Sequence, residues 1–201
     1  MADLQRVTGS RASAYRTLGA LRRTGFAEPL KEGHFSLRSS FFQPLYLWQH
    51  LTPSLDAFRQ ARYFGRSYNE SDIQAVRRIL DGTVTLDYRA YELTGLQKPY
   101  LFFLYVDDLN SASDALRENG FWQGRRGRVA ILPHTGSFRN DVERLYLDCI
   151  AYGGRSTLDA IAVEILRKND LDPKMRGVFR AEDVLKVRDE LATRESGARS
   201  G

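Results

Sequence analysis

Residues 100–106 have the sequence Tyr100-Leu101-Phe102-Phe103-Leu104-Tyr105-Val106, a continuous apolar run. A short run that is apolar on both faces indicates a buried β-strand rather than a half-exposed one. Such a strand needs cover on both sides, because neither row of side chains is suited to water. The run therefore predicts the central strand of a sheet that is covered on both faces.

Further strands are expected on either side of this run, at residues 83–89 and 128–132. The stretch Thr83–Arg89 partly alternates between apolar and polar residues, as a strand does. Helical periodicity and stop signals predict helices before and after these strands. The expected helices are 51–65, 70–80, 113–119, 139–151, 157–168 and 181–193. The expected order is helices, then a middle segment that contains both strands and helices, then further helices. This order predicts an α+β domain rather than a repeating βαβ array.

The composition excludes several classes of protein. The chain of 201 residues is 42% hydrophobic and contains only 6 Pro, so it has enough apolar material for a core and is not a disordered protein. It has no apolar run near the ~20 residues that cross a bilayer. A single cysteine excludes an internal disulfide and a cysteine-rich zinc site. We expect a soluble cytoplasmic protein with no membrane partner, no metal and no cofactor.

Positive charge is concentrated at the N-terminus. Residues 1–40 carry seven Lys or Arg and three Asp or Glu, whereas the other 161 residues carry 23 and 22. Most of the net charge of +5 therefore lies in the first fifth of the chain. A local positive field of this kind attracts a polyanion such as a nucleic acid.

The same forty residues contain the pattern of two short helices separated by a turn. A first helix is expected to end at Gly9, and Ser10 can cap the second by accepting a backbone hydrogen bond. Ala14, Leu18 and Leu21 then lie on one face of the second helix, which predicts its buried side. A small hairpin is expected over residues 26–38.

This order resembles the winged helix-turn-helix family of DNA-binding domains across residues 2–39, and Ser13–Leu18 is similar to the recognition helix of ferric-uptake-type repressors. The resemblance implies that the second helix enters the major groove of duplex DNA and that the Lys31–His34 turn is the wing. Arginine can contact either the bases or the backbone of DNA, because its guanidinium binds guanine edges and phosphate groups. The predicted DNA-binding residues are Ser10, Arg11, Ser13, Tyr15, Arg16, Arg22, Arg23, Lys31, His34 and Arg38.

The overall layout loosely resembles the AbiEi-type antitoxin-regulators of type IV toxin–antitoxin systems. The resemblance rests on Val142–Asp148 after a Leu-Pro strand end and on the turn Tyr152-Gly153-Gly154. It implies a regulator that represses its own operon, with a C-terminal domain that supplies antitoxin activity and binds a toxin or a second copy. We expect a winged helix-turn-helix domain at 1–40 packed on an α+β partner domain at 41–195, followed by a disordered tail at 196–201.

A metal-dependent enzyme is the alternative from another class. Asp107 and Asp108 follow the most apolar strand, as the metal ligands of polymerases do, and would serve a nucleotidyl-transferring enzyme with an N-terminal nucleic-acid module. The same residues are also ordinary turn formers. A second nucleotidyltransferase pattern is Gly136-Ser137 with Asp141 and Glu143, although residues two apart on a helix face different directions.

Other candidate residues have a simpler explanation in each case. Cys149 lies on the apolar stripe of a helix and is expected to be buried, and His134 is expected on the surface. The basic residues Arg125–Arg128 would extend a nucleic-acid track or form a solvated hairpin tip. A purely architectural or single-strand binder is a third hypothesis, with a stacking platform formed by Tyr88, Tyr91, Tyr100 and Tyr105.

Overall fold

The computed structural model describes residues 12, 27–29, 35–37, 39–66, 70–124, 126–136 and 138–198. The chain divides into two compact units, Met1–Trp48 and Gln49–Gly201. In the first unit, strands β1 (Ala27–Pro29) and β2 (Phe35–Leu37) pair antiparallel. Helix α3 (Ser39–Arg59) begins in the first unit and ends in the second.

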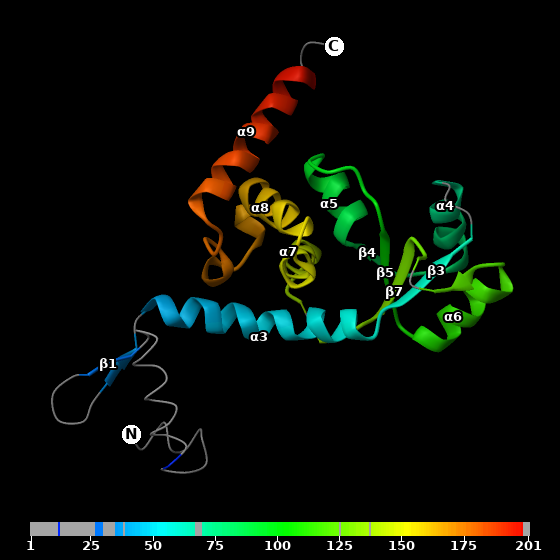
Figure 1. Ribbon diagram of the computed structural model, residues 1–201, viewed down its shortest axis with the longest axis horizontal. Coiled ribbons are helices and arrows are strands. Elements are labelled where there is room, and N and C mark those ends of the chain that lie inside the picture. The colour runs from blue at the N-terminus through cyan, green and yellow to red at the C-terminus, as the bar shows by residue number, and fades with distance from the viewer. Residues whose placement is uncertain are drawn as a thin grey trace. The chain divides into compact units, whose positions relative to one another are not determined.

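A mixed five-stranded sheet in the order β4-β5-β7-β3-β6 is the centre of the second unit (Figure 1). β5 and β7 are parallel, and the other pairs are antiparallel. All of β5 is buried, so the predicted central strand is confirmed. The strands are β3 (Arg62–Gly65), β4 (Thr83–Thr85), β5 (Phe102–Val106), β6 (Trp122–Gln123) and β7 (Val129–Pro133).

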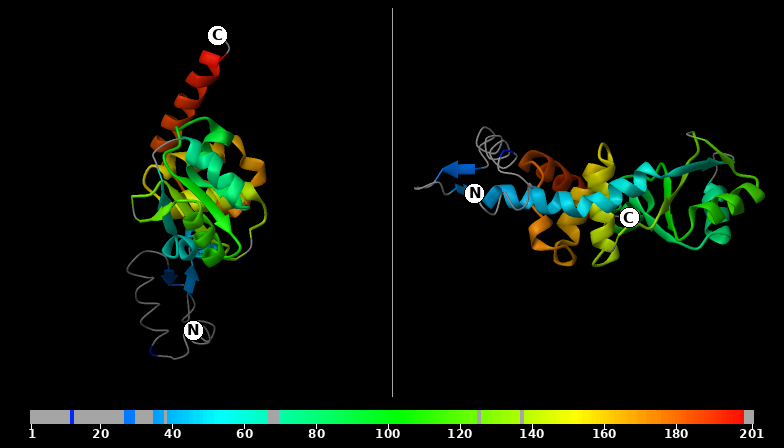
Figure 2. Two further views of the ribbon diagram at one scale, coloured as in Figure 1. Left: turned by 90° about the vertical axis from the view of Figure 1, so that its right-hand side faces the viewer. Right: turned by 90° about the horizontal axis from the view of Figure 1, so that it is seen from below.

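Helices α4 (Glu70–Ile79) and α6 (Leu109–Glu118) cover one face of this sheet (Figures 1 and 2). Val76 of α4 and Leu116 of α6 are fully buried against alternate residues of the strands, including Phe102. Both helices have one apolar face toward the sheet, which is why their periodicity made them predictable.

The opposite face is covered by α5 (Leu86–Thr94) and α7 (Asp141–Tyr152), with α8 (Ser156–Leu166) and α9 (Ala181–Ala198) packed behind them. A second core cluster joins these outer helices through Leu96, Ile161 and Val187. Two short 3₁₀ helices, η2 (Lys168–Asp170) and η3 (Pro173–Met175), connect α8 to α9. The α+β class is therefore confirmed for this unit.

The strand predicted over 83–89 is wrong after Thr85. Leu86 has a φ of 52° and is fully buried, and helix α5 begins at this residue. A positive φ is rare for a residue with a branched side chain and turns the chain out of the extended conformation. The burial of Leu86 and a hydrogen bond from Thr85 to α7 hold the turn in place.

The helix predicted over 51–65 is also wrong at its end. α3 stops at Arg59, and residues 62–65 form β3 between β7 and β6. Arg62 pairs with Ile131 and Phe64 pairs with Val129 in the ladder with β7. The hydrogen bonds of these distant partners override the local helical pattern.

At the C-terminal end, α9 extends to Ala198, past the start of the tail that was expected to be disordered from Ser196. In the described part of the chain, no helix has the length and apolar character needed to cross a membrane.

Candidate functional site

The predicted DNA-binding residues lie outside the described residues. They are Ser10, Arg11, Ser13, Tyr15, Arg16, Arg22, Arg23, Lys31, His34 and Arg38. The structure does describe the strands of the hairpin predicted over 26–38. β1 and β2 pair in register from Ala27 with Leu37 to Pro29 with Phe35, so the hairpin strands are confirmed.

The Asp107-Asp108 pair is separated into two different environments. The Asp108 carboxylate caps α6, accepting hydrogen bonds from the backbone N–H groups of Asn110 (2.9 Å) and Ser111 (3.3 Å). A hydrogen bond from the Ser111 hydroxyl and these backbone donors hold the pKa of Asp108 below its usual value. Asp107 is fully exposed, and its Oδ1 lies 3.8 Å from Nε2 of His134. Among the described residues, no group of three or more His, Cys, Asp or Glu is placed to hold a metal ion.

The second nucleotidyltransferase pattern is also dispersed. Asn140 caps α7 by accepting a hydrogen bond from the backbone N–H of Glu143 at 2.8 Å. Asp141 is exposed and Glu143 is buried, so their carboxylates do not face a common site. Ser137 lies outside the described residues.

The predicted burial of Cys149 and the predicted exposure of His134 are both confirmed. Cys149 is fully buried, and burial raises the pKa of its thiol, which disfavours the nucleophilic thiolate. His134 lies at the surface with its ring stacked on Tyr105 at a centroid distance of 5.3 Å. Tyr105 is buried and therefore is not part of an exposed stacking platform, whereas Tyr100 is 58% exposed.

A buried polar network, which the sequence analysis did not identify, connects β4, β5 and α7. Asp148 is fully buried and accepts hydrogen bonds from Tyr105 Oη at 2.8 Å and Thr85 Oγ1 at 2.6 Å. Burial raises the pKa of Asp148 to about 6, in opposition to the hydrogen-bond donors around it. A carboxylate within the apolar stretch of α7 was the signal that could have predicted this network.

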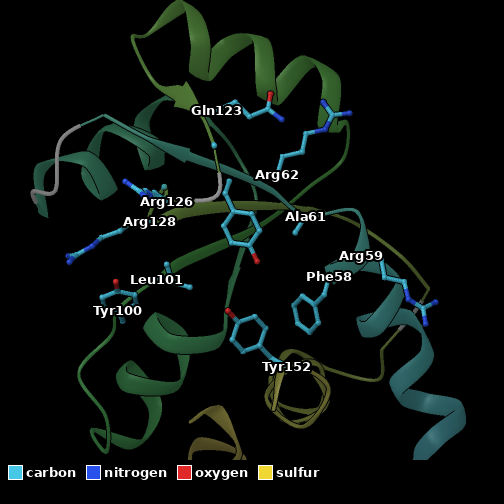
Figure 3. Close-up of a pocket in the computed structure, with 13 residues that line it drawn as sticks. Phe58, Arg59, Ala61, Arg62, Tyr100, Leu101, Gln123, Arg126, Arg128 and Tyr152 are labelled. Atoms are coloured by element: carbon cyan, nitrogen blue, oxygen red, sulfur yellow. The ribbon is translucent and has the colours of Figure 1, made fainter. Parts of the chain in front are cut away.

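A cavity of about 810 Å³ lies in the second unit (Figure 3). Segments that are far apart in the sequence form its walls: the end of α3 with the start of β3, the residues before β5, the turn between β6 and β7, and the end of α7. Its described lining contains basic and aromatic side chains but no Asp or Glu. A cavity of this size is suited to a small molecule.

Two arginines and a tyrosine form one side of the cavity. Arg126 and Arg128 extend from the turn before β7, and Tyr100 lies near them in Figure 3. The Arg128 guanidinium lies 4.8 Å from the centre of the Tyr100 ring, which is a cation–π distance. This side of the cavity, which we call the basic side, is therefore suited to an anion.

The other two arginines of the lining have partners elsewhere. Arg59 forms a 2.9 Å ion pair with Asp56, and its guanidinium points away from the cavity in Figure 3. Arg62 donates hydrogen bonds of 2.8 Å to Ser113 and to Asn110, both in α6. Arg126 and Arg128 are the two exposed cations of the lining that lie on the turn before β7.

Aromatic rings form the opposite side of the cavity. The Tyr152 ring packs edge to face against Phe58 at 5.4 Å and against Phe103 at 5.2 Å. Burial, together with the neighbouring Tyr63 and Asp87, raises the pKa of Tyr152 to about 12, so its hydroxyl keeps its proton at neutral pH. The aromatic side also contains Tyr63, whose side chain forms a hydrogen bond with that of Tyr152.

Only part of this cavity was predictable from the sequence. Arg125–Arg128 and Tyr100 were candidate binding residues, of which Arg125 lies outside the described residues, but no sequence pattern connected them with Phe58, Tyr63 or Tyr152. Comparison of the chain with protein-family models, with curated proteins and with solved structures finds no match.

Proposed function

We propose that this protein is a sequence-specific transcriptional regulator that binds double-stranded DNA through residues 1–40. The observation that supports this most directly is the antiparallel pairing of β1 with β2, at the place where a wing follows a helix-turn-helix pattern. The hairpin belongs to the forty residues that hold most of the net positive charge. A positive field close to a groove-binding element supplies affinity for the DNA backbone.

The two units have separate roles in this proposal. The N-terminal unit is a winged helix-turn-helix that binds DNA, and the second unit binds a toxin protein or a second copy of the chain. The protein acts in the cytoplasm as the antitoxin and autorepressor of a toxin–antitoxin pair. A nucleotidyltransferase toxin encoded by the neighbouring gene would support this role, and purification of the two gene products as a complex would test the partnership.

The DNA-binding proposal is tested with two substitutions in the full chain, measured against a selected operator and a scrambled duplex at several salt concentrations. Arg16→Ala removes a predicted base contact, so it should weaken operator binding most and remove about 1–3 kcal/mol of discrimination. Arg23→Ala removes a predicted phosphate contact. It should weaken both duplexes alike and reduce the salt slope by about 0.9.

Lys186→Ala is the matched control, because it removes one exposed positive charge from α9 and should leave the affinity for both duplexes unchanged. Failure to enrich any duplex from a random pool would overturn the proposal. Equal loss of both duplexes with Arg16→Ala would show that the recognition helix docks differently.

The capping role of Asp108 favours the regulator over the nucleotidyl-transferring alternative, because its carboxylate is directed to the N-terminus of α6. That alternative predicts magnesium-dependent turnover of labelled nucleotides that is abolished by Asp107→Asn.

A further inference from the structure

We infer that the outer edge of strand β4 binds a second copy of this chain, so that two β4 strands pair antiparallel about a two-fold axis. The inference deepens the proposed function and rests on it in one respect, the binding of a second copy by the second unit. It does not depend on DNA binding by residues 1–40, because every residue that carries it belongs to Gln49–Gly201.

Strand β4 lies at one end of the five-stranded sheet (Figure 1). Residues Thr83–Thr85 pair with Phe103–Tyr105 of β5 on one side, and no other described segment forms a backbone ladder with them. An edge strand presents backbone N–H and C=O groups that can pair with a further strand. Proline and charged residues normally block such pairing, and the sequence Thr-Val-Thr contains neither.

A groove of about 470 Å³ lies beside this edge. Its uncharged walls include Leu80, Gly82, Thr83, Val84 and Leu104. Gly82 is exposed and has no side chain to cover the backbone, and Val84 is only partly buried. The groove therefore gives an incoming strand access to β4.

The end of the groove at which β4 begins, which we call the acidic end, carries two exposed carboxylates. Asp81 precedes the strand, and Asp141 is the first residue of α7. The last residue of α7, Tyr152, packs against Phe103 at the other end of the β4–β5 ladder, so Asp141 lies on the Asp81 side. The nearest cation to Asp141 is Arg144, 3.9 Å away, so neither carboxylate is held in a close ion pair.

The other end of the groove, which we call the basic end, carries Arg77 of α4 and Arg89 of α5. Arg77 lies over the ring of Phe102, directly before the partner of Thr85, and α5 follows β4. Both arginines form 3.2 Å ion pairs with the same carboxylate, that of Glu92. One carboxylate balances only one of the two charges. Each guanidinium has five N–H donors and can bind a further acceptor.

This charge order makes the groove complementary to itself. A two-fold axis perpendicular to β4 reverses the strand direction and places the acidic end of each copy against the basic end of the other. Asp81 and Asp141 of each copy then face the two arginines of the second copy. Two-fold contacts of this isologous kind are the commonest in homo-oligomers and require such self-complementarity. The same surface supplies both halves of the contact, which favours a second copy over an unrelated strand.

The test is sedimentation equilibrium of the full chain without DNA. The wild type should dimerise with a Kd below about 100 μM. Asp81→Arg directs an arginine at the basic end of the second copy, and Arg89→Asp directs a carboxylate at its acidic end. Each variant alone should therefore associate at least about tenfold more weakly. An equimolar mixture of the two should recover the wild-type affinity within about threefold, because both contacts then join an arginine to an aspartate.

Asp189→Arg is the matched control, because it makes the same exchange at an exposed position of α9 outside the groove and should leave the Kd unchanged. A wild type that stays monomeric at about 100 μM would overturn the inference and leave this edge to a strand of another protein. So would wild-type affinity in both single variants, or a mixture that does not recover.

Operator binding, measured separately, distinguishes this inference from the proposed function. A dimer that binds no DNA would overturn the regulator and retain the β4 contact, whereas a monomer that binds its operator would do the reverse.

Discussion

The hydroxyl of Tyr105 donates a 2.8 Å hydrogen bond to the buried carboxylate of Asp148 and thereby joins the central strand β5 to helix α7. The guanidinium of Arg144 lies over the same tyrosine ring, 5.5 Å from its centre. The carboxylate is thus removed from water but surrounded by donors and a positive charge. A buried charge is tolerated only with compensation of this kind.

Replacement of Tyr105 by Phe should destabilise the protein by about 1–3 kcal/mol, because Asp148 loses a donor that water cannot replace in the core. Urea unfolding at pH 7.5 measures this change. Tyr100→Phe is the control, since Tyr100 is exposed and should change the free energy of unfolding by less than about 0.5 kcal/mol. Equal stability of the two variants would show that the hydrogen bond of Tyr105 does not stabilise the fold.

Asp148 should make the protein less stable as the pH rises from about 4 to about 6. Its folded-state pKa is raised to about 6, whereas an unfolded Asp titrates near about 3.9. Within this window the folded protein keeps a proton that the unfolded chain has lost, so stability falls with increasing pH and then levels off. Asp148→Asn has no proton to lose at this position.

From pH 4 to pH 7, the unfolding free energy of Asp148→Asn minus that of the wild type should therefore increase by roughly 2–3 kcal/mol. Urea unfolding across this range measures the shift. Asp159, whose pKa is also raised by burial, is present in both proteins and cancels in the comparison. A difference that is constant with pH would show that Asp148 titrates normally.

Asn140→Ala should cost about 1–2 kcal/mol, because Asn140 both caps α7 and donates a 2.9 Å hydrogen bond to the carbonyl of Asp170. Thermal unfolding followed by circular dichroism provides the measurement. Asn169→Ala, at an exposed position in η2, should stay within about 0.5 kcal/mol of the wild type. If both substitutions had the same effect, capping by Asn140 would contribute nothing measurable.

Substitution of alanine at each of two glycines should destabilise the protein, for a different reason at each position. A Cβ at Gly127 would lie 2.2 Å from backbone atoms of Phe64 in β3, so Gly127→Ala should cost about 1–3 kcal/mol through steric overlap. A Cβ at Gly154 would meet no atom within 4 Å, but its φ is 56°. Gly154→Ala should therefore cost about 1 kcal/mol through backbone strain.

Chemical denaturation of both variants checks these values. Only Gly127→Ala should also disturb the adjacent cavity, which near-ultraviolet circular dichroism of Trp122 and the surrounding tyrosines would detect. Wild-type stability of Gly127→Ala would show that the turn before β7 is farther from β3 than the structure places it.

The sequence by itself was enough to predict the central strand, β7, most of the helices and the hairpin strands of the first forty residues. These elements carry a local pattern of apolar residues that reports which face is buried, as in α6 and in Phe102–Val106. The burial of Cys149 followed from the same periodicity.

The tertiary structure alone decided β3, the turn at Leu86, the Asp148 network and the cavity. Arg62–Gly65 becomes a strand because its hydrogen-bond partners lie in β7 and β6, far along the chain, and no local pattern encodes such partners. Tyr152 comes to face Arg126 and Arg128 across the cavity only after α7 has packed on the sheet. Long-range pairing and packing, rather than local propensity, therefore determine which side chains share a site.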